Sequence, residues 1–210
     1  MPVDCLIEDD GTTSIPLIPV GPDALSNVAA RLSNGTAGWI AAAGFKAKPG
    51  TVLLLPGGNG SPIGGALVGV EGDNDIWSWG GAAVALPAGN YRIDGELSAE
   101  AANRAALGWA LGSYAFSRYK KNETPECNLA WPKGADRTWV IAAATATNQV
   151  RDLINTPAGD MGPADLARAA QDLAGEFNAE FAVTVGEELL ERNYPAIHAV
   201  GRAAAVAPRL

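Results

Sequence analysis

The chain has 210 residues, which is enough for one ordinary domain or for one domain and part of a second. Hydrophobic residues make up 48% of it and charged residues 18%, so a buried core is available and disorder is disfavoured. The formal net charge is -8, which argues against electrostatic binding to nucleic acid or to anionic membranes.

Strands and helices are expected to alternate along the first half of the chain. The expected strands are short apolar runs bounded by turn residues, at 3–8, 15–20, 51–55, 66–70 and 91–94. Helices are expected at 25–32, where apolar residues recur with helical spacing, and at 37–43. Residues 71–75 form a polar turn. This alternation predicts an α/β fold.

A long helix is expected from Ser98 to about Lys121. Small residues lie along one side of it: Ala101, Ala105, Gly108, Gly112 and Ala115. Glycine costs ~1 kcal/mol relative to alanine inside a helix, so the two glycines indicate close packing, which we expect to be against the sheet. Lys120 and Lys121 suit a last turn, where positive charge meets the negative end of the helix dipole.

The second half is expected to continue with a strand at 128–131 and a helix from Asp136 to Asn155. The inward face of that helix is expected to hold Val140, Ala144, Thr147, Val150 and Ile154. Thr156-Pro157 ends the helix, because the residue before a proline is pushed out of helical geometry.

A further helix begins at Pro163, a residue suited to the first helical position. Its buried side is expected to comprise Leu166, Ala170, Leu173 and Phe177. A strand at 181–185, a helical turn at 187–191 and an apolar strand at 196–200 follow. The predicted domains are an N-terminal α/β domain at 1–135, a linker helix at 136–157 and the start of a second α/β domain at 158–210. The last part is too small to bury a core alone, which predicts a truncated domain.

Motifs for phosphate binding are incomplete. The glycine-rich stretch 56–65 has no Gly-Lys pair, as a Walker loop requires, and Ile63 stands where a dinucleotide-binding loop needs its third glycine after Gly58 and Gly60. The stretch 56–65 is therefore interpreted as a hairpin or loop, and not as a phosphate-binding loop.

Metal and nucleophile patterns are also incomplete. Asp73 and Asp75 begin like a calcium loop, but Ser78 replaces the required glycine, so a solvated turn is expected. His198 is the only histidine, which excludes a two-histidine zinc site. Because it lies in a predicted apolar strand, it is interpreted as a hydrogen-bonded core residue.

Cys5 and Cys127 form no CxxC pair and are interpreted as partly buried, reduced thiols. The sequence contains no GxSxG motif, which would have indicated the nucleophilic serine of a hydrolase.

Tryptophan is the other residue type that could contact a ligand. The sequence has six, at Trp39, Trp77, Trp79, Trp109, Trp131 and Trp139. Without a basic groove around them, core packing is favoured over stacking on bases or sugars.

Two blocks near the end of the chain carry a family pattern. The first is VRDLINTP at 150–157 with DMGPADL at 160–166, and the second is YPAIHAVGR at 194–202 with APRL at 207–210. They resemble the junction between the N-terminal and catalytic domains, and the approach to the catalytic core, of the leucyl aminopeptidase (cytosol aminopeptidase) family. Residues 1–150 resemble the variable N-terminal domain more loosely, through the helix at 98–121 and Trp131-Pro132.

The resemblance implies a macro-like, mixed-sheet N-terminal domain and a metal-dependent peptidase domain. In that family two divalent ions, zinc or manganese, lower the pKa of a bridging water and polarise the scissile carbonyl of a peptide. The ligands are a lysine, aspartates and a glutamate, and an arginine-held bicarbonate is the base, in motifs around GKG…FDTGG and NTDAEGRL. Neither motif occurs here, so no catalytic, cofactor-binding or metal-ligating residue is assigned.

The leading hypothesis is that this chain is the N-terminal portion of such an aminopeptidase. By itself it is expected to be inactive, and in the whole protein it is expected to serve assembly and access to the active site. The resemblance implies a hexameric parent that meets peptide substrates through its missing domain. The alternative, from another class of function, is a free-standing, non-catalytic interaction or ligand-binding module.

Nucleic-acid binding, a second role of some bacterial members of the family, is disfavoured by the acidic charge. A cytoplasmic protein is expected, since no signal peptide or apolar run of ~20 residues is seen.

Overall fold

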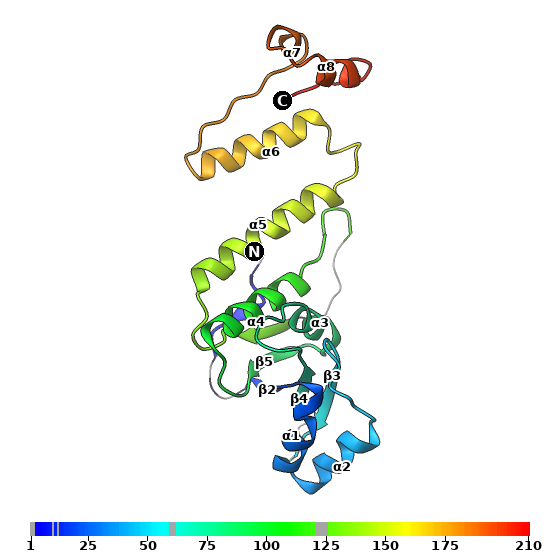
Figure 1. The fold of residues 1–210 in the computed structure, drawn as a ribbon, viewed down its shortest axis with the longest axis vertical. Coiled ribbons are helices and arrows are strands. Elements are labelled where there is room, and N and C mark those ends of the chain that lie inside the picture. The colour runs from blue at the N-terminus through cyan, green and yellow to red at the C-terminus, as the bar shows by residue number, and fades with distance from the viewer. Residues whose placement is uncertain (1–2, 10, 12, 59–61, 121–125) are drawn as a thin grey trace. The chain divides into compact units, whose positions relative to one another are not determined.

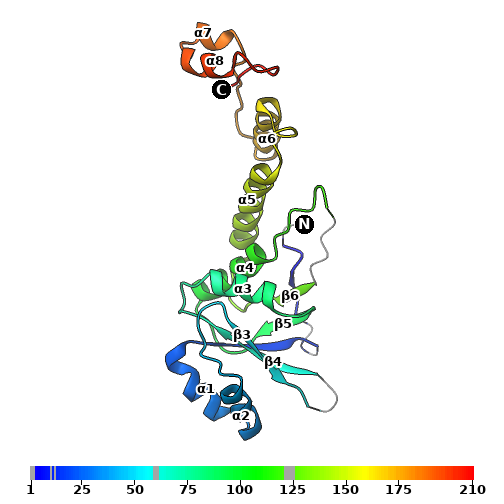
Figure 2. The same cartoon turned by 90° about the vertical axis from the view of Figure 1, so that its right-hand side faces the viewer.

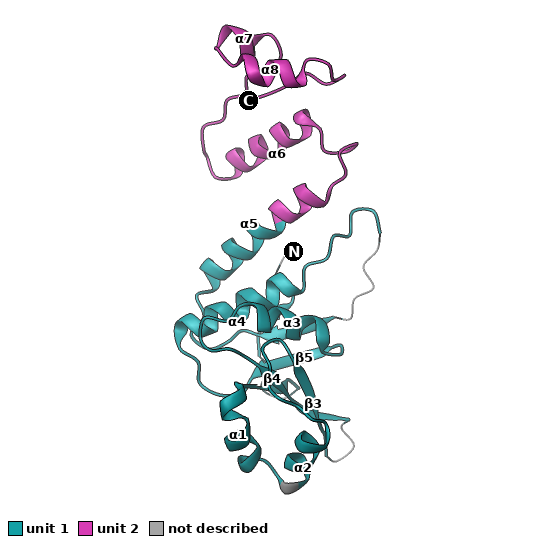
Figure 3. Ribbon diagram, turned by 45° about the vertical axis from the view of Figure 1, so that its right-hand side comes forward, with its two compact units in different colours: residues 1–148 teal, residues 149–210 magenta. Residues whose placement is uncertain are grey.

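The computed structural model describes residues 3–9, 11, 13–58, 62–120 and 126–210 (Figure 1). The expectations for Gly60 and Lys121 concern residues outside these ranges. The chain divides into two compact units, 1–148 and 149–210, coloured separately in Figure 3. Each unit is described by itself below.

A six-stranded sheet forms the centre of the first unit, in the order β1-β6-β5-β2-β4-β3. Its strands are β1 Leu6–Ile7, β2 Ile15–Val20, β3 Val52–Pro56, β4 Ile63–Gly69, β5 Gly89–Ile93 and β6 Cys127–Ala130. The edge strand β3 pairs with β4 in antiparallel fashion, and every other neighbouring pair is parallel. This mixed sheet confirms the expected fold class, and the β3–β4 pairing confirms a hairpin around the glycine-rich stretch.

Helices cover both faces of this sheet (Figure 2). One face carries α1 Leu25–Arg31 and α2 Asn34–Ala42, and the other carries α3 Trp77–Ala85 and α4 Ala99–Gly112. Side chains of β4 alternate between the two cores, since Ala66 and Val68 pack with α3 and α4 while Leu67 packs with α1 and α2. A parallel sheet requires such cover, because both of its faces are apolar.

Helix α4 ends nine residues earlier than the 98–121 pattern predicted, at Gly112. Gly112 and Ser113 are adjacent weak helix formers, and the Ser113 N–H closes the last turn on the Trp109 carbonyl at 2.9 Å. Lys120 lies in the non-helical segment that follows, so it does not meet the end of the helix dipole. The N-terminal cap is Ser98, whose hydroxyl accepts the Ala101 N–H at 3.2 Å.

The glycines of α4 pack against helix α3 and not against the sheet, which corrects the sequence-based expectation. A Cβ atom on Gly112 would overlap the Gly80 backbone, and one on Gly108 would overlap the Ile76 carbonyl. Helix α3 itself was not predicted. Its N-terminus is fixed by Asp75, whose Oδ1 accepts the Ser78 N–H at 2.9 Å.

Helix α5, Arg137–Asn155, begins in the first unit and ends in the second. Its predicted inward face is only partly correct. Val140 and Ala144 are buried in the core of the first unit, but Thr147, Val150 and Ile154 are exposed and Asn148 is buried instead. The apolar spacing shows which side of a helix is hydrophobic, and it does not show how far along the helix that side is covered.

The rest of the second unit consists of α6 Pro163–Glu176, α7 Glu188–Glu191 and α8 Pro195–Gly201. The predicted buried side of α6 is wrong, since Leu166, Ala170, Leu173 and Phe177 are all exposed. No described residue beyond Ala144 belongs to either hydrophobic core cluster. The second unit, taken by itself, therefore leaves this helix without a covering layer.

Two predicted strands of the second unit are also wrong. Residues 181–185 form no strand, and Val185 makes only an isolated bridge with Arg209. Residues 196–200 belong to helix α8, because Pro195 favours a first helical position and alanines 196 and 199 favour the helix that follows.

The contact between α3 and α4 can be tested by adding one methyl group. Gly112→Ala is expected to lower the free energy of unfolding of the first unit by about 1–3 kcal/mol, since the new Cβ must displace the Gly80 backbone. Gly38→Ala in α2 is the matched control, because nothing lies within 4 Å of its added Cβ. Urea unfolding of both variants measures the difference, and equal stability would contradict the close contact.

Candidate functional site

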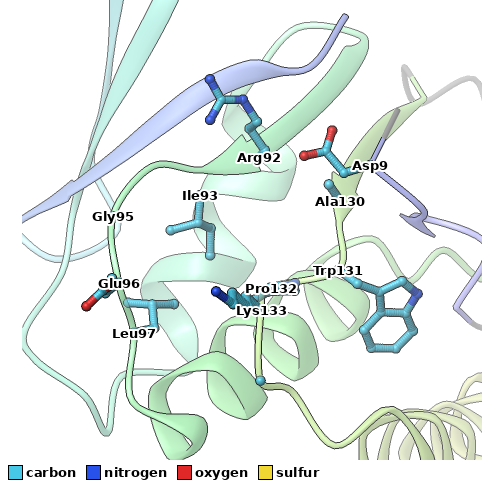
Figure 4. Close-up of a pocket in the computed structure, with 11 residues that line it drawn as sticks. Asp9, Arg92, Ile93, Gly95, Glu96, Leu97, Ala130, Trp131, Pro132 and Lys133 are labelled. Carbon is cyan, nitrogen blue, oxygen red and sulfur yellow. The ribbon is translucent and has the colours of Figure 1, made fainter. Parts of the chain in front are cut away.

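A cavity lies at the carboxyl ends of β1, β5 and β6, three strands that neighbour one another in parallel (Figure 4). Its volume is about 400 Å³. The residues around it follow directly after the strands: Asp9 after β1, 95–97 after β5 and 131–134 after β6. Open α/β sheets hold their ligands at this end of the strands, so the cavity is the candidate site of the first unit.

Charges of both signs surround the cavity, with Asp9 and Glu96 opposed by Arg92 and Lys133. Asp9 is held by its own loop, because its Oδ1 accepts the Gly11 N–H at 3.1 Å and the Ser14 hydroxyl at 3.0 Å. The Arg92 guanidinium lies 3.7 Å from the Asp94 carboxylate, on the surface. An exposed pair of this length is weak, so Arg92 remains available to a ligand.

Trp131 is one of the lining residues, and its ring, which Figure 4 shows turned away from Ile93 and Leu97, is positioned by Arg137. The Arg137 guanidinium lies 5.1 Å from the centre of the Trp131 ring, within cation–π range. Both nitrogens of its fork donate to Glu8, and the Nη2–Oε2 distance is 2.9 Å. These hydrogen bonds lower the pKa of Glu8, raise that of Arg137, and join the end of β1 to the start of α5.

The two thiols and Tyr91 lie in the core behind this sheet edge. Burial raises the pKa of Cys127 to about 12 and also raises the pKa of Cys5. Burial raises the pKa of Tyr91 to about 12, and its hydroxyl donates to the Pro87 carbonyl at 2.8 Å. Both cysteines are free. Both shifts favour the protonated thiols near neutral pH, which disfavours their reaction as nucleophiles.

The other residues singled out from the sequence have structural roles. Asp75 accepts backbone N–H groups of Glu71 and Ser78, both at 2.9 Å, so the 71–75 segment is a helix-capping turn. These hydrogen bonds outweigh the effect of partial burial and lower the pKa of Asp75. The Asp73 carboxylate accepts the Ser98 hydroxyl at 3.2 Å.

His198 was expected to be a hydrogen-bonded core residue of a strand; it is hydrogen-bonded, but it is half-buried in helix α8 and belongs to neither core cluster. Its Nε2 is 3.1 Å from the Glu187 carboxylate. The tryptophans divide into two groups. Trp79 and Trp109 are buried in the core and Trp131 is half-buried against it, whereas Trp39, Trp77 and Trp139 are exposed, which corrects the expectation of core packing for these three.

No metal-binding cluster is found within the described part of the chain, where no group of three or more His, Cys, Asp or Glu side chains is arranged to hold an ion. Helices long and apolar enough to cross a membrane are likewise not found among those residues.

The reactivity of Cys127 provides a test of the buried core. Raising its pKa from 9.0 to about 12 lowers its thiolate fraction roughly a thousandfold at neutral pH. Iodoacetamide is therefore expected to leave Cys127 unmodified in the folded chain and to alkylate it fully in denaturant, as measured by peptide mass spectrometry. Rapid alkylation of Cys127 without denaturant would contradict the burial.

The Glu8–Arg137 pair is expected to make stability depend on pH. Because the folded-state pKa of Glu8 is lowered, the stabilisation is present above its ordinary value of 4.5 and is lost as pH falls through the folded-state value. Glu8→Gln should thus lower the melting temperature at neutral pH and match the parent in acid. Glu71→Gln, another exposed glutamate, is the control, and a pH-independent difference for Glu8→Gln would contradict the pairing.

Comparison with known proteins places both units in one family. Residues 15–132 match the family model of the M17 aminopeptidase N-terminal domain, and residues 148–210 match the model of the cytosol aminopeptidase family catalytic domain. A probable cytosol aminopeptidase of Leifsonia xyli is 32% identical over 193 residues, which cover 84% of this chain and 39% of that protein.

Solved structures agree with these matches. The cytosol aminopeptidase of Coxiella burnetii superposes with a TM-score of 0.85 at 34% identity, covering 98% of this chain and 45% of that one. The bottromycin maturation enzyme BotP in complex with Mn gives a TM-score of 0.70 at 28% identity, covering 93% and 44%. The chain spans less than half of the length of each of these relatives. It belongs to the M17, or cytosol aminopeptidase, family.

Proposed function

We propose that the whole protein is a metal-dependent aminopeptidase that removes N-terminal residues from peptides. This chain would supply its N-terminal domain and the first part of its catalytic domain. The observation that carries the proposal is the order of two family matches on one chain, with the N-terminal domain at 15–132 followed by the catalytic domain from 148. The two are joined by helix α5, which begins in one unit and ends in the other.

Two divalent metal ions, zinc or manganese, are part of this proposal. The complex of BotP with Mn supports metal dependence in a relative. The described residues of this chain do not fit a metal centre, since no cluster of ligating side chains occurs among them. We therefore assign no ligand here, and we place the ions with residues of the catalytic domain other than those described.

The N-terminal unit is proposed to serve assembly and access to the active sites of a hexamer. Its support is structural, because this unit has its own two-sided core and yet exposes large apolar side chains on its helices, including Trp77 at 70% and Val84 at 64% exposure. Contiguous exposed apolar surface often marks an interaction site. A cytoplasmic location is proposed from the names of relatives, which are cytosol aminopeptidases.

A second candidate is a free-standing, non-catalytic interaction or ligand-binding module. The self-contained core of the first unit and the cavity at the ends of β1, β5 and β6 favour it. The two candidates differ in whether the gene encodes more of the catalytic domain after residue 210.

An activity assay tests the proposal. The 210-residue chain is expected to hydrolyse no leucine p-nitroanilide, with or without added manganese. The product of the same reading frame, extended beyond codon 210, is expected to give manganese-dependent turnover that a chelator abolishes. Turnover by the 210-residue chain alone would contradict the assignment of chemistry to other residues. A frame that stops there, or an inactive extended product, would favour the second candidate.

A further inference from the structure

The cavity in the first unit has the size and position of a small-molecule site. Its volume of about 400 Å³ lies near the lower end of the ~300–1,000 Å³ in which small ligands bind. It opens where the adjacent parallel strands β1, β6 and β5 end. A cavity of this size suits a ligand of a few to a dozen heavy atoms, and not a large cofactor.

The inner surface of the cavity is apolar. Pro132 and Ala130 are buried, and Ile93, Leu97 and Trp131 are half-buried. The Trp131 ring is held by Arg137, which Glu8 holds in turn. The aliphatic side chains of Ile93 and Leu97, together with Pro132, suit an apolar or aromatic group of a ligand, because burial of apolar surface is favourable.

The rim carries charged side chains, of which Asp9 and Arg92 have partners within the protein and Glu96 and Lys133 have none among the described residues. Among the described residues, the side chains of Glu96 and Lys133 make no hydrogen bond or ion pair, and Asp9 uses only its Oδ1. Figure 4 shows Glu96 on the loop after β5 and Asp9 on the opposite side of the view, with Lys133 between them. These groups come from loops after three strands, so they converge only in the folded sheet.

The signs of these charges select the class of ligand. Two carboxylates and two cationic groups cancel, so a polyanion meets repulsion from Asp9 and Glu96, while a simple cation meets repulsion from Arg92 and Lys133. A molecule with one ammonium and one carboxylate satisfies both. We propose that this cavity binds a free amino acid with an apolar or aromatic side chain, its charged groups at the rim and its side chain against Ile93, Leu97 and Pro132.

Binding of L-phenylalanine to the full 210-residue chain, measured by isothermal titration calorimetry, tests the proposal. N-acetyl-L-phenylalanine lacks the ammonium and L-phenylalaninamide lacks the carboxylate. Each derivative is expected to bind about threefold to fivefold more weakly than phenylalanine, as is usual for the loss of one solvent-exposed charge pair. The side chain is the same in all three probes, so the comparison isolates the charges.

Variants of the rim test which residues are responsible. Glu96→Gln and Lys133→Met are expected to weaken phenylalanine binding by a similar factor, and both positions are exposed, so neither change disturbs the core. Glu71→Gln and Lys46→Met are matched controls at exposed positions that do not line the cavity. These controls should bind phenylalanine as the parent does.

Several results would overturn the inference. They are the absence of phenylalanine binding, binding of either derivative as tight as that of phenylalanine, rim variants that bind as the controls do, or inorganic phosphate displacing phenylalanine at lower concentration. The measurement involves no peptide hydrolysis, so its failure would leave the proposed aminopeptidase function standing.

Discussion

The structure of the first unit depends on covering a largely parallel sheet on both faces. Successive residues of β4 point to opposite cores, and Ala66, Leu67 and Val68 are all fully buried. On one side the cover is made by α3 and α4, which approach so closely that glycines 80, 108 and 112 lie at their contact. On the other it is made by the smaller pair α1 and α2. The strand order brings the ends of β1, β6 and β5 together around the cavity.

The second unit lacks such a core. Leu189 is fully buried there, but the apolar side chains of α6 are exposed, and the buried face of α5 does not extend past Asn148. The catalytic-domain family model matches this part of the chain, and the relatives are more than twice as long. No group of side chains arranged to hold a metal ion occurs among the described residues of this part. The aminopeptidase function is consequently proposed for the whole protein, and the described residues account for the scaffold beside it.

Much of the fold could be predicted from sequence, and the failures have physical causes. Apolar runs bounded by turns predicted all six strands of the sheet. Helix α3 was missed because Trp77–Ala85 is apolar on all sides and contains Gly80-Gly81, leaving Asp75 as the only local signal. Helix α8 was predicted as a strand because a short apolar run fits both structures. The cavity was missed because Asp9, Glu96 and Lys133 are far apart in sequence and meet only through a strand order that no local pattern encodes.

We infer that the first unit is a complete folding unit and that the second is part of a larger domain. Hydrogen exchange of the 210-residue chain tests this inference, because amide protection reports the local free energy of opening. The slowest exchange is expected in β2, β4 and α4, and exchange faster by orders of magnitude is expected in α6. Protection of α6 equal to that of β4 would show that the second unit is stable by itself, and would contradict the inference.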